Sequence, residues 1–191
     1  MVYFVGAGAG DPELLTVKGK RLIDNADTII YAGSLVNPAV LADRKPNCQV
    51  YDSAGMTLEE VLAVMQETEA QGKTTVRVHT GDASIYGAIR EQLDALDKLG
   101  ISHTVVPGVS SFLAAAAAMQ KEYTLPDVTQ TVILTRMEGR TPVPERERLE
   151  ELYEDCDGRF AFIAGYTDGG APYGVMWEEV GIDPGLPFEE K

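Results

Sequence analysis

The chain has 191 residues, of which 45% are hydrophobic, and its formal net charge is −14. This length suits one large domain or two small ones with a sizeable buried core. The negative charge argues against nucleic acid and against anionic membranes as partners. No apolar run approaches the roughly 18 residues of a membrane helix, and the N-terminus lacks the pattern of a signal peptide, so we expect a cytoplasmic protein.

The cysteines and histidines of the chain lie far apart in the sequence. Cys48 and Cys156 do not make a disulfide framework. His79 and His103 lack the spacing of a metal site. We therefore expect no bound metal.

The first dozen residues have the pattern of a strand, a tight turn and a helix start. The apolar run Val2–Val5 is followed by three alternating glycines within Gly6–Gly10, then by Asp11 and Pro12. Asp11 is a good N-cap, and proline fits the first helical turn. The pattern predicts a helix over 13–25, with a ligand-binding turn before it.

This turn does not match a dinucleotide site. The dinucleotide fingerprint is G-x-G-x-x-G followed by an acidic residue after the second strand. Gly10 comes one place early, Asp11 takes the sixth place, and the second predicted strand, Thr28–Tyr31, ends without a carboxylate. We expect a ligand that is neutral or cationic overall and has no pyrophosphate. A tight turn without a ligand is the alternative.

Two later loops repeat the pattern. The predicted strand 74–79 runs into Thr80–Gly87, and the predicted strand 101–106 runs into Pro107–Ser111. In a parallel sheet such loops lie together at the carboxyl ends of the strands. The repetition predicts an α/β fold with one composite site.

Periodicity and turn signals predict further elements. The capping box Thr57–Glu60 opens a helix that Gly72 ends. The other predictions are a short helix over 39–43, helices over 89–99 and 112–120, and strands over 49–51, 129–135 and 160–164.

Several polar residues allow two interpretations. Asp82 orients a ligand or caps the next turn, and Ser110 and Ser111 are at least N-cap candidates. Arg136 and Arg140 lie among turn residues of an acidic chain. They suit a carboxylate-bearing partner, or they are ordinary surface arginines.

These motifs resemble the tetrapyrrole methylases, the class III methyltransferases that use S-adenosylmethionine (SAM) on corrin and sirohaem precursors. Gly6–Pro12 resembles the family's opening G-x-G-P-G-D-P, with Ala9 in place of proline. His79–Ala83 is similar to its second glycine loop, with Ala83 in place of proline, and Pro107–Ser111 is similar to its third turn.

Within the family the resemblance is to the precorrin-4 and cobalt-precorrin-4 methyltransferases, which methylate ring carbon 11 in cobalamin biosynthesis. It is carried by Val78–Asp82, Ile85–Ile89, Thr129–Arg136 and Gly139–Pro144. The resemblance covers roughly 1–148, and the strand Phe160–Ala164 still fits the family pattern.

The resemblance implies two α/β domains with a ligand cleft between them, a homodimer, and no nucleic-acid or membrane partner. The corresponding domains are 1–118 and 119–191. Because the chain is shorter than the family usually is, and because nothing after Gly165 matches, we expect the second domain to be incomplete.

The resemblance also implies the site residues. SAM, the methyl donor, is expected to contact Ala9, Thr80, Gly81, Asp82, Ile85, Tyr86, Ser110, Ser111, Ile163 and Ala164. The tetrapyrrole substrate is expected at Gly8, Gly10, Asp11, Arg136 and Arg140. Asp11 is the candidate helper for loss of a proton from the macrocycle, and Arg77, inside a strand, is left out of this set.

Other functions stay open at this point. A methylase acting at another tetrapyrrole position is the nearest alternative. A SAM-fold binding protein without turnover is the second. A nucleotide-dependent dehydrogenase is disfavoured by the early Gly10 and by the missing acidic residue after Thr28–Tyr31.

Overall fold

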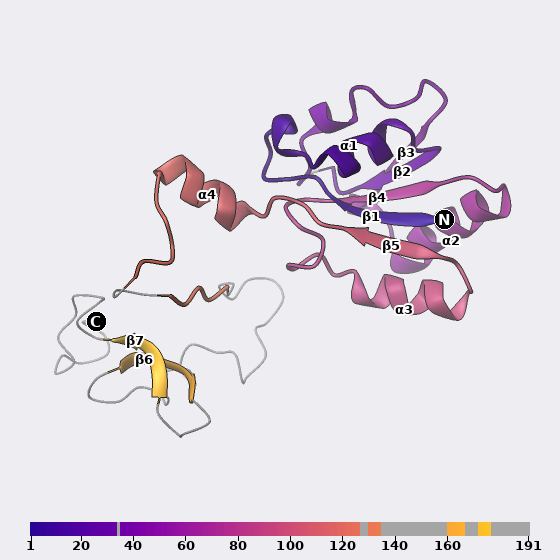
Figure 1. The fold of residues 1–191 in the computed structure, drawn as a ribbon. Coiled ribbons are helices and arrows are strands. Elements are labelled where there is room, and N and C mark those ends of the chain that lie inside the picture. The colour runs from indigo at the N-terminus through magenta and orange to yellow at the C-terminus, as the bar shows by residue number, and fades with distance from the viewer. Residues whose placement is uncertain (34, 127–129, 135–159, 167–171, 177–191) are drawn as a thin grey trace. The chain divides into compact units, whose positions relative to one another are not determined.

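The structure, a computed structural model, describes residues 1–33, 35–126, 130–134, 160–166 and 172–176. The chain divides into two compact units, Met1–Gln120 and Lys121–Lys191, which are drawn in Figure 1. Each unit is described by itself. The predicted domain division at residue 118 stays a prediction.

The first unit is built on a five-stranded sheet in the order β3-β2-β4-β1-β5. All of its strand pairs are parallel. The strands are β1 (Val2–Gly6), β2 (Thr28–Tyr31), β3 (Gln49–Asp52), β4 (Thr75–His79) and β5 (His103–Val106). The predicted α/β class is confirmed, and the loops that follow β1, β4 and β5 leave the same edge of the sheet.

Helices cover both faces of this sheet. In Figure 1, α1 (Val17–Asp24) lies on one face, while α2 (Leu58–Ala70) and α3 (Arg90–Lys98) lie on the other. Alternate residues of the strands point to opposite faces of the sheet and pack into two hydrophobic cores. The core on the α1 side includes Val5, Ile23, Ile29, Val76 and Val78. The core on the α2 and α3 side includes Phe4, Ile30, Met65 and Leu96.

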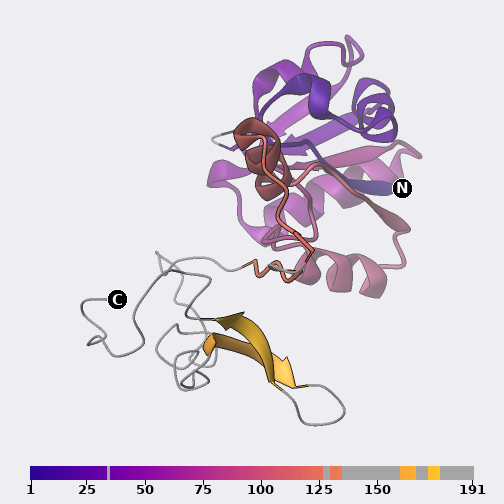
Figure 2. The ribbon, with the colours of Figure 1, turned by 60° about the vertical axis from the view of Figure 1, so that its left-hand side comes forward.

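Short helices make up the rest of the unit. They are the 3₁₀ turns η1 (Pro12–Leu14), η2 (Pro38–Leu41) and η3 (Ser53–Gly55), and the α-helix α4 (Ser111–Met119), which Figure 2 shows from another side. Among the described residues, no helix combines the length and the apolar character that crossing a membrane requires.

The capping box at Thr57 is confirmed, but one predicted helix was wrong in extent. The single helix over 13–25 is split, because Asp11 caps only the short turn η1 and Thr16 caps a separate helix, α1, through the Gly19 N–H. Leu15 between them is extended, with ψ at 140°. The helical stretch predicted over 39–43 is present as the short 3₁₀ helix η2, Pro38–Leu41.

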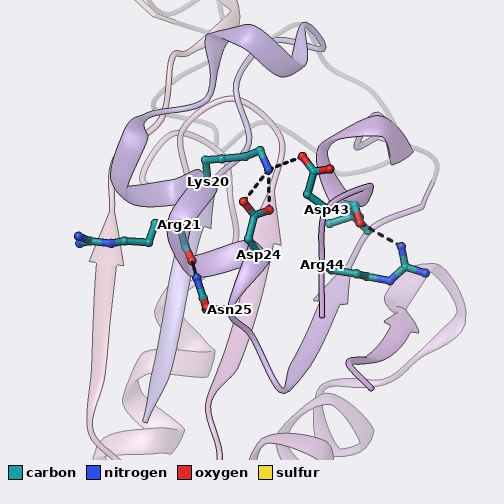
Figure 3. Close-up of polar contacts among 7 residues, drawn as sticks. Lys20, Arg21, Asp24, Asn25, Asp43 and Arg44 are labelled. Atoms are coloured by element: carbon teal, nitrogen blue, oxygen red, sulfur yellow. Dashed lines mark hydrogen bonds and ion pairs between the residues drawn. The ribbon is translucent and has the colours of Figure 1, made fainter. Parts of the chain in front are cut away.

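A polar cluster ties α1 to the segment after η2 (Figure 3). The Lys20 ammonium lies 2.6 Å from an Asp24 carboxylate oxygen and 2.8 Å from an Asp43 oxygen. These two hydrogen bonds raise the pKa of Lys20. The cluster lies on the surface, where such ion pairs add little stability.

The second unit contains an antiparallel pair of strands, β6 (Phe160–Tyr166) and β7 (Pro172–Met176). The predicted strand at 160–164 is therefore confirmed, and it runs two residues further. Of the predicted strand 129–135, the described residues 130–134 form no strand. An apolar β-prone run becomes a strand only where another strand pairs with it.

Candidate functional site

The three loops at the carboxyl edge of the sheet meet at Gly6, Gly81 and Gly108. A Cβ at Gly6 would lie 2.5 Å from the Gly81 carbonyl oxygen, and a Cβ at Gly108 would lie 2.2 Å from that same oxygen. Real Cβ atoms do not approach backbone so closely. Glycine is therefore required here so that three backbone segments can touch. We call these three residues the glycine junction.

Backbone hydrogen bonds fix the first two loops to each other. The Ala7 N–H donates to the His79 carbonyl at 2.7 Å. Gly8 and Gly81 exchange two hydrogen bonds, at 3.3 Å and 2.8 Å. The first loop is thus locked to the second without any side chain.

The Asp82 side chain fixes the second loop to the third. One carboxylate oxygen accepts from the Gly108 N–H at 2.8 Å. The other accepts from the Ser84 N–H at 2.8 Å and from the Ser84 hydroxyl. Burial, which leaves Asp82 9% exposed, raises its pKa, but these hydrogen bonds outweigh it and hold the pKa below the usual range. Asp82 is therefore an ionised group that caps its own turn.

A cavity of about 450 Å³ opens beside this junction. Its wall combines the end of β4, the loop after it, the start of α4, and Leu35 after β2. Seven residues that the family resemblance assigns to SAM line it: Thr80, Gly81, Asp82, Ile85, Tyr86, Ser110 and Ser111. Two loops far apart in sequence thus contribute to one cavity.

The rim of the cavity has an unusual backbone. Tyr86 and Ala88 have positive φ angles of 54° and 49°. Non-glycine residues adopt this conformation rarely, and it is found most often where function requires it. A Cβ at Gly87, between them, would lie 2.0 Å from the Ala83 carbonyl oxygen. The sequence of this segment is therefore constrained to a tight shape at the cavity mouth.

His79 lies in the cavity wall with an unmet hydrogen-bonding group. The residue is 8% exposed, and its ring stacks on Phe4 with the ring centroids 6.0 Å apart. Within the part of the chain that the structure describes, its Nε2 atom has no hydrogen-bond partner. Burial and the charge of Arg77 lower the pKa of His79 to about 4, so the imidazole is neutral at neutral pH.

The residues of the first loop do not line this cavity. Ala9, Gly10 and Asp11 are exposed, whereas Gly8 is buried against the second loop. The Asp11 carboxylate accepts from the Glu13 N–H at 2.9 Å. Its predicted part in proton loss stays a prediction, as do the substrate contacts of Gly8, Gly10 and Asp11.

Four further predicted site residues belong to the second unit. Ile163 and Ala164 lie in β6, and their contact with SAM stays a prediction. Arg136 and Arg140, the predicted partners of the tetrapyrrole carboxylates, fall outside the described residues.

Sequence reasoning did not assign several residues that line the cavity to the site, namely Ala32, Leu35, Val78, His79, Gly87, Ala88 and Gln92. It also left Arg77 aside because that residue lies inside a strand. Strand alternation could have found Arg77 and His79, which lie two residues apart and therefore on one face of β4. Over the described ranges there is no group of three or more His, Cys, Asp or Glu that could hold a metal ion.

Comparisons with known proteins agree with this geometry. The family model for tetrapyrrole (corrin/porphyrin) methylases matches residues 1–169. The chain is 59% identical, over 151 residues, to a cobalt-precorrin-4 C(11)-methyltransferase of Methanocaldococcus jannaschii, covering 79% of this chain and 58% of the relative. It is 54% identical to the enzyme of that name from Priestia megaterium, with the same coverage. The chain thus spans well under two thirds of these relatives.

Solved structures give the same result. A cobalt-precorrin-4 methyltransferase matches with a TM-score of 0.76 and 52% identity, covering 81% of this chain and 65% of that one. A Thermus thermophilus uroporphyrin-III C-methyltransferase in complex with S-adenosylhomocysteine matches with a TM-score of 0.52 and 38% identity, covering 60% of this chain and 47% of that one. The chain belongs to the tetrapyrrole (corrin/porphyrin) methylases.

Proposed function

We propose that this chain transfers a methyl group from SAM to ring carbon 11 of cobalt-precorrin-4 or precorrin-4 in cobalamin biosynthesis. One observation carries the proposal. Seven predicted SAM residues from two loops line one cavity, in a chain that is 59% identical over 151 residues to a cobalt-precorrin-4 C(11)-methyltransferase.

The cavity has the features that SAM requires. Its volume of about 450 Å³ lies in the usual range for small-molecule sites. Leu35, Ile85 and Tyr86 offer apolar contact, while Ser110 offers a hydroxyl and Asp82 a carboxylate. SAM is a zwitterion with an added sulfonium charge and no phosphate, and the ionised Asp82 suits its positive groups.

The part played by the protein is mainly positioning. When bound, SAM supplies a methyl group whose bond to a positively charged sulfur breaks as the ring carbon donates the electron pair of the new bond. The glycine junction holds the loops after β4 and β5 in fixed register, so that the ring carbon and the methyl group can be held in line. Asp82 maintains that register through Gly108. We nominate no strong general base.

The cellular setting follows from the family resemblance. We propose a homodimer in the cytoplasm, with the tetrapyrrole as a small-molecule partner. Light scattering coupled to size-exclusion chromatography measures the oligomer directly. A monomeric mass at micromolar concentration contradicts the homodimer and leaves the methyl-transfer proposal intact.

Calorimetric titration of the 191-residue chain with SAM and S-adenosylhomocysteine tests the cofactor site. We expect micromolar affinity, or about −8 kcal/mol. Transfer of labelled methyl from SAM is then measured with cobalt-precorrin-4, precorrin-4 and uroporphyrinogen III as separate substrates.

The outcomes separate the alternatives. Label in the first two substrates supports methylation at carbon 11, and label only in uroporphyrinogen III indicates another position. Cofactor binding without transfer to any substrate indicates a binding protein. Absence of cofactor binding by folded protein contradicts the proposed site.

A further inference from the structure

A buried arginine in the cavity wall has only neutral hydrogen-bond partners among the described residues. Arg77 lies in the middle of β4 and is 9% exposed. Its Nη1 donates to the Ser53 hydroxyl at 2.9 Å, and its Nε donates to the Gln92 side-chain oxygen at 3.4 Å. Both partners are neutral. Within the described part of the chain, no ion pair joins Arg77 to a carboxylate.

This arrangement is unfavourable for a protein without a ligand. A guanidinium keeps its charge in proteins, and burying it without an opposite charge costs stability. Burial lowers the pKa of Arg77, and no neighbouring acid acts against that. Asp82, the ionised carboxylate of the same cavity, is occupied by Ser84 and Gly108. It does not neutralise the guanidinium.

The surroundings of Arg77 point to the type of ligand. Its two protein partners fix the plane of the guanidinium and leave further N–H donors without a described partner. A planar group with two negatively charged oxygens matches such a set of donors.

We propose that Arg77, held by Ser53 and Gln92, binds a carboxylate group of the ligand in this cavity. The inference rests on the proposed function, because both ligands of the reaction carry carboxylates. One source is the amino-acid carboxylate of SAM, and the other is an acid side chain of the tetrapyrrole. The chemistry at Arg77 is the same for both.

Titrations with three probes identify the source. The probes are S-adenosylhomocysteine, its analogue without the carboxylate, and uroporphyrin, a stable macrocycle rich in carboxylates. For Arg77→Gln we expect a loss of about 10- to 100-fold in affinity for one carboxylate probe. If that probe is S-adenosylhomocysteine, the variant and the unchanged chain bind the decarboxylated analogue equally.

The variant Gln92→Glu tests the same idea in the opposite direction. It places a carboxylate beside the guanidinium, 3.4 Å from Nε in the present geometry, and so supplies an internal partner. We expect a higher melting temperature without ligand, together with a lower affinity for the probe that Arg77→Gln affects. The result does not depend on Arg77→Gln folding well.

Arg90→Gln is the matched control, because it removes an exposed arginine from the neighbouring helix α3. It is expected to leave all three affinities unchanged. If the unchanged chain binds neither S-adenosylhomocysteine nor uroporphyrin, the proposed function itself fails. If it binds them and neither Arg77→Gln nor Gln92→Glu alters either affinity, only the carboxylate assignment is overturned.

Discussion

The charged groups at the two edges of the parallel sheet differ in whether they have a partner of opposite charge. At the amino edge, Asp27 accepts from the Thr74 N–H at 3.0 Å and pairs with Lys45, also at 3.0 Å. Towards the carboxyl edge, Arg77 in the middle of β4 is buried with only neutral partners among the described residues. His79, the last residue of β4, has an unbonded ring nitrogen. In the part of the chain that the structure describes, the amino edge also has two buried side-chain oxygens without a hydrogen bond. The Thr75 hydroxyl carries no charge, and the Glu69 carboxylate is ion-paired with the amino group of Met1.

This difference distinguishes an edge with a structural role from an edge that is suited to bind a ligand. At the amino edge the charge is compensated within the chain, so that edge needs nothing further. At the carboxyl edge the backbone is tightly fixed by the glycine junction, while the side chains beside it keep unmet charge and donors. A rigid frame with unsatisfied groups is what a preorganised ligand site requires.

The largest effect is expected from Gly108→Ala. The added Cβ would lie 2.2 Å from the Gly81 carbonyl oxygen and 2.7 Å from the Gly6 Cα, and both neighbours are backbone that cannot rotate away. We expect the free energy of unfolding to fall by about 3 kcal/mol or more. Urea denaturation measures it, and SAM affinity is expected to fall with it.

Gly55→Ala is the control, since a Cβ there meets nothing within 4 Å. It should change stability by less than about 1 kcal/mol. Equal stability of the two variants would show that the loops can separate at little cost, and the rigid-frame interpretation would then fail.

The next effect is the acid sensitivity of the carboxyl edge. In the unfolded chain the His79 imidazole takes a proton below its ordinary pKa of 6.5, but in the folded chain only below about 4. Between these values the unfolded state binds more protons, so stability is full above the upper value and is lost as the pH falls towards the lower one. The loss is on the order of 3 kcal/mol.

Urea denaturation at a series of pH values measures this loss, and His79→Gln should flatten the curve in that window. His103→Gln, which replaces the other histidine of the chain, is the matched control. If the plot of stability against pH for His79→Gln ran parallel to that of the unchanged chain, His79 would take up its proton as easily in the folded state as in the unfolded state. The burial interpretation would then be wrong.

Much of the backbone frame at the carboxyl edge could be predicted from the sequence. The strands, their shared edge and the three loops follow from apolar runs punctuated by glycine and proline, which act locally. Seven of the residues assigned to SAM by resemblance line one cavity, because the motifs fix their places in the loops.

The pairings were not available from the sequence. Asp82 and Gly108 are 26 residues apart in the sequence, and Arg77 and Ser53 are 24 apart. No local sequence pattern therefore predicts either hydrogen bond. The split of the first helix was missed for a related reason. Asp11 and Thr16 are both valid caps, and propensity alone does not decide between one long helix and two short ones.

A smaller effect is expected from Asp82→Asn. The amide has one acceptor oxygen, whereas the carboxylate accepts from Gly108 with one oxygen and from Ser84 with the other. One buried N–H therefore faces an NH₂ group and loses its partner. We expect a loss of about 1–3 kcal/mol in urea denaturation and weaker SAM binding. Unchanged SAM affinity would show that Asp82 does not contribute to the cofactor site.

The smallest effect is expected from Asp27→Asn, the equivalent change at the amino edge. The amide oxygen can still accept from the Thr74 N–H, so only the ion pair with Lys45 is lost. Asp27 is partly exposed, and the loss should be about 0.5–1 kcal/mol, shrinking as salt is added. Lys45→Gln removes the same pair from the other side and should cost the same. SAM affinity should not change in either variant, because neither residue lines the cavity. If Asp27→Asn weakened SAM binding as much as Asp82→Asn, the two edges would not be functionally distinct, and the unmet groups on β4 would need another explanation.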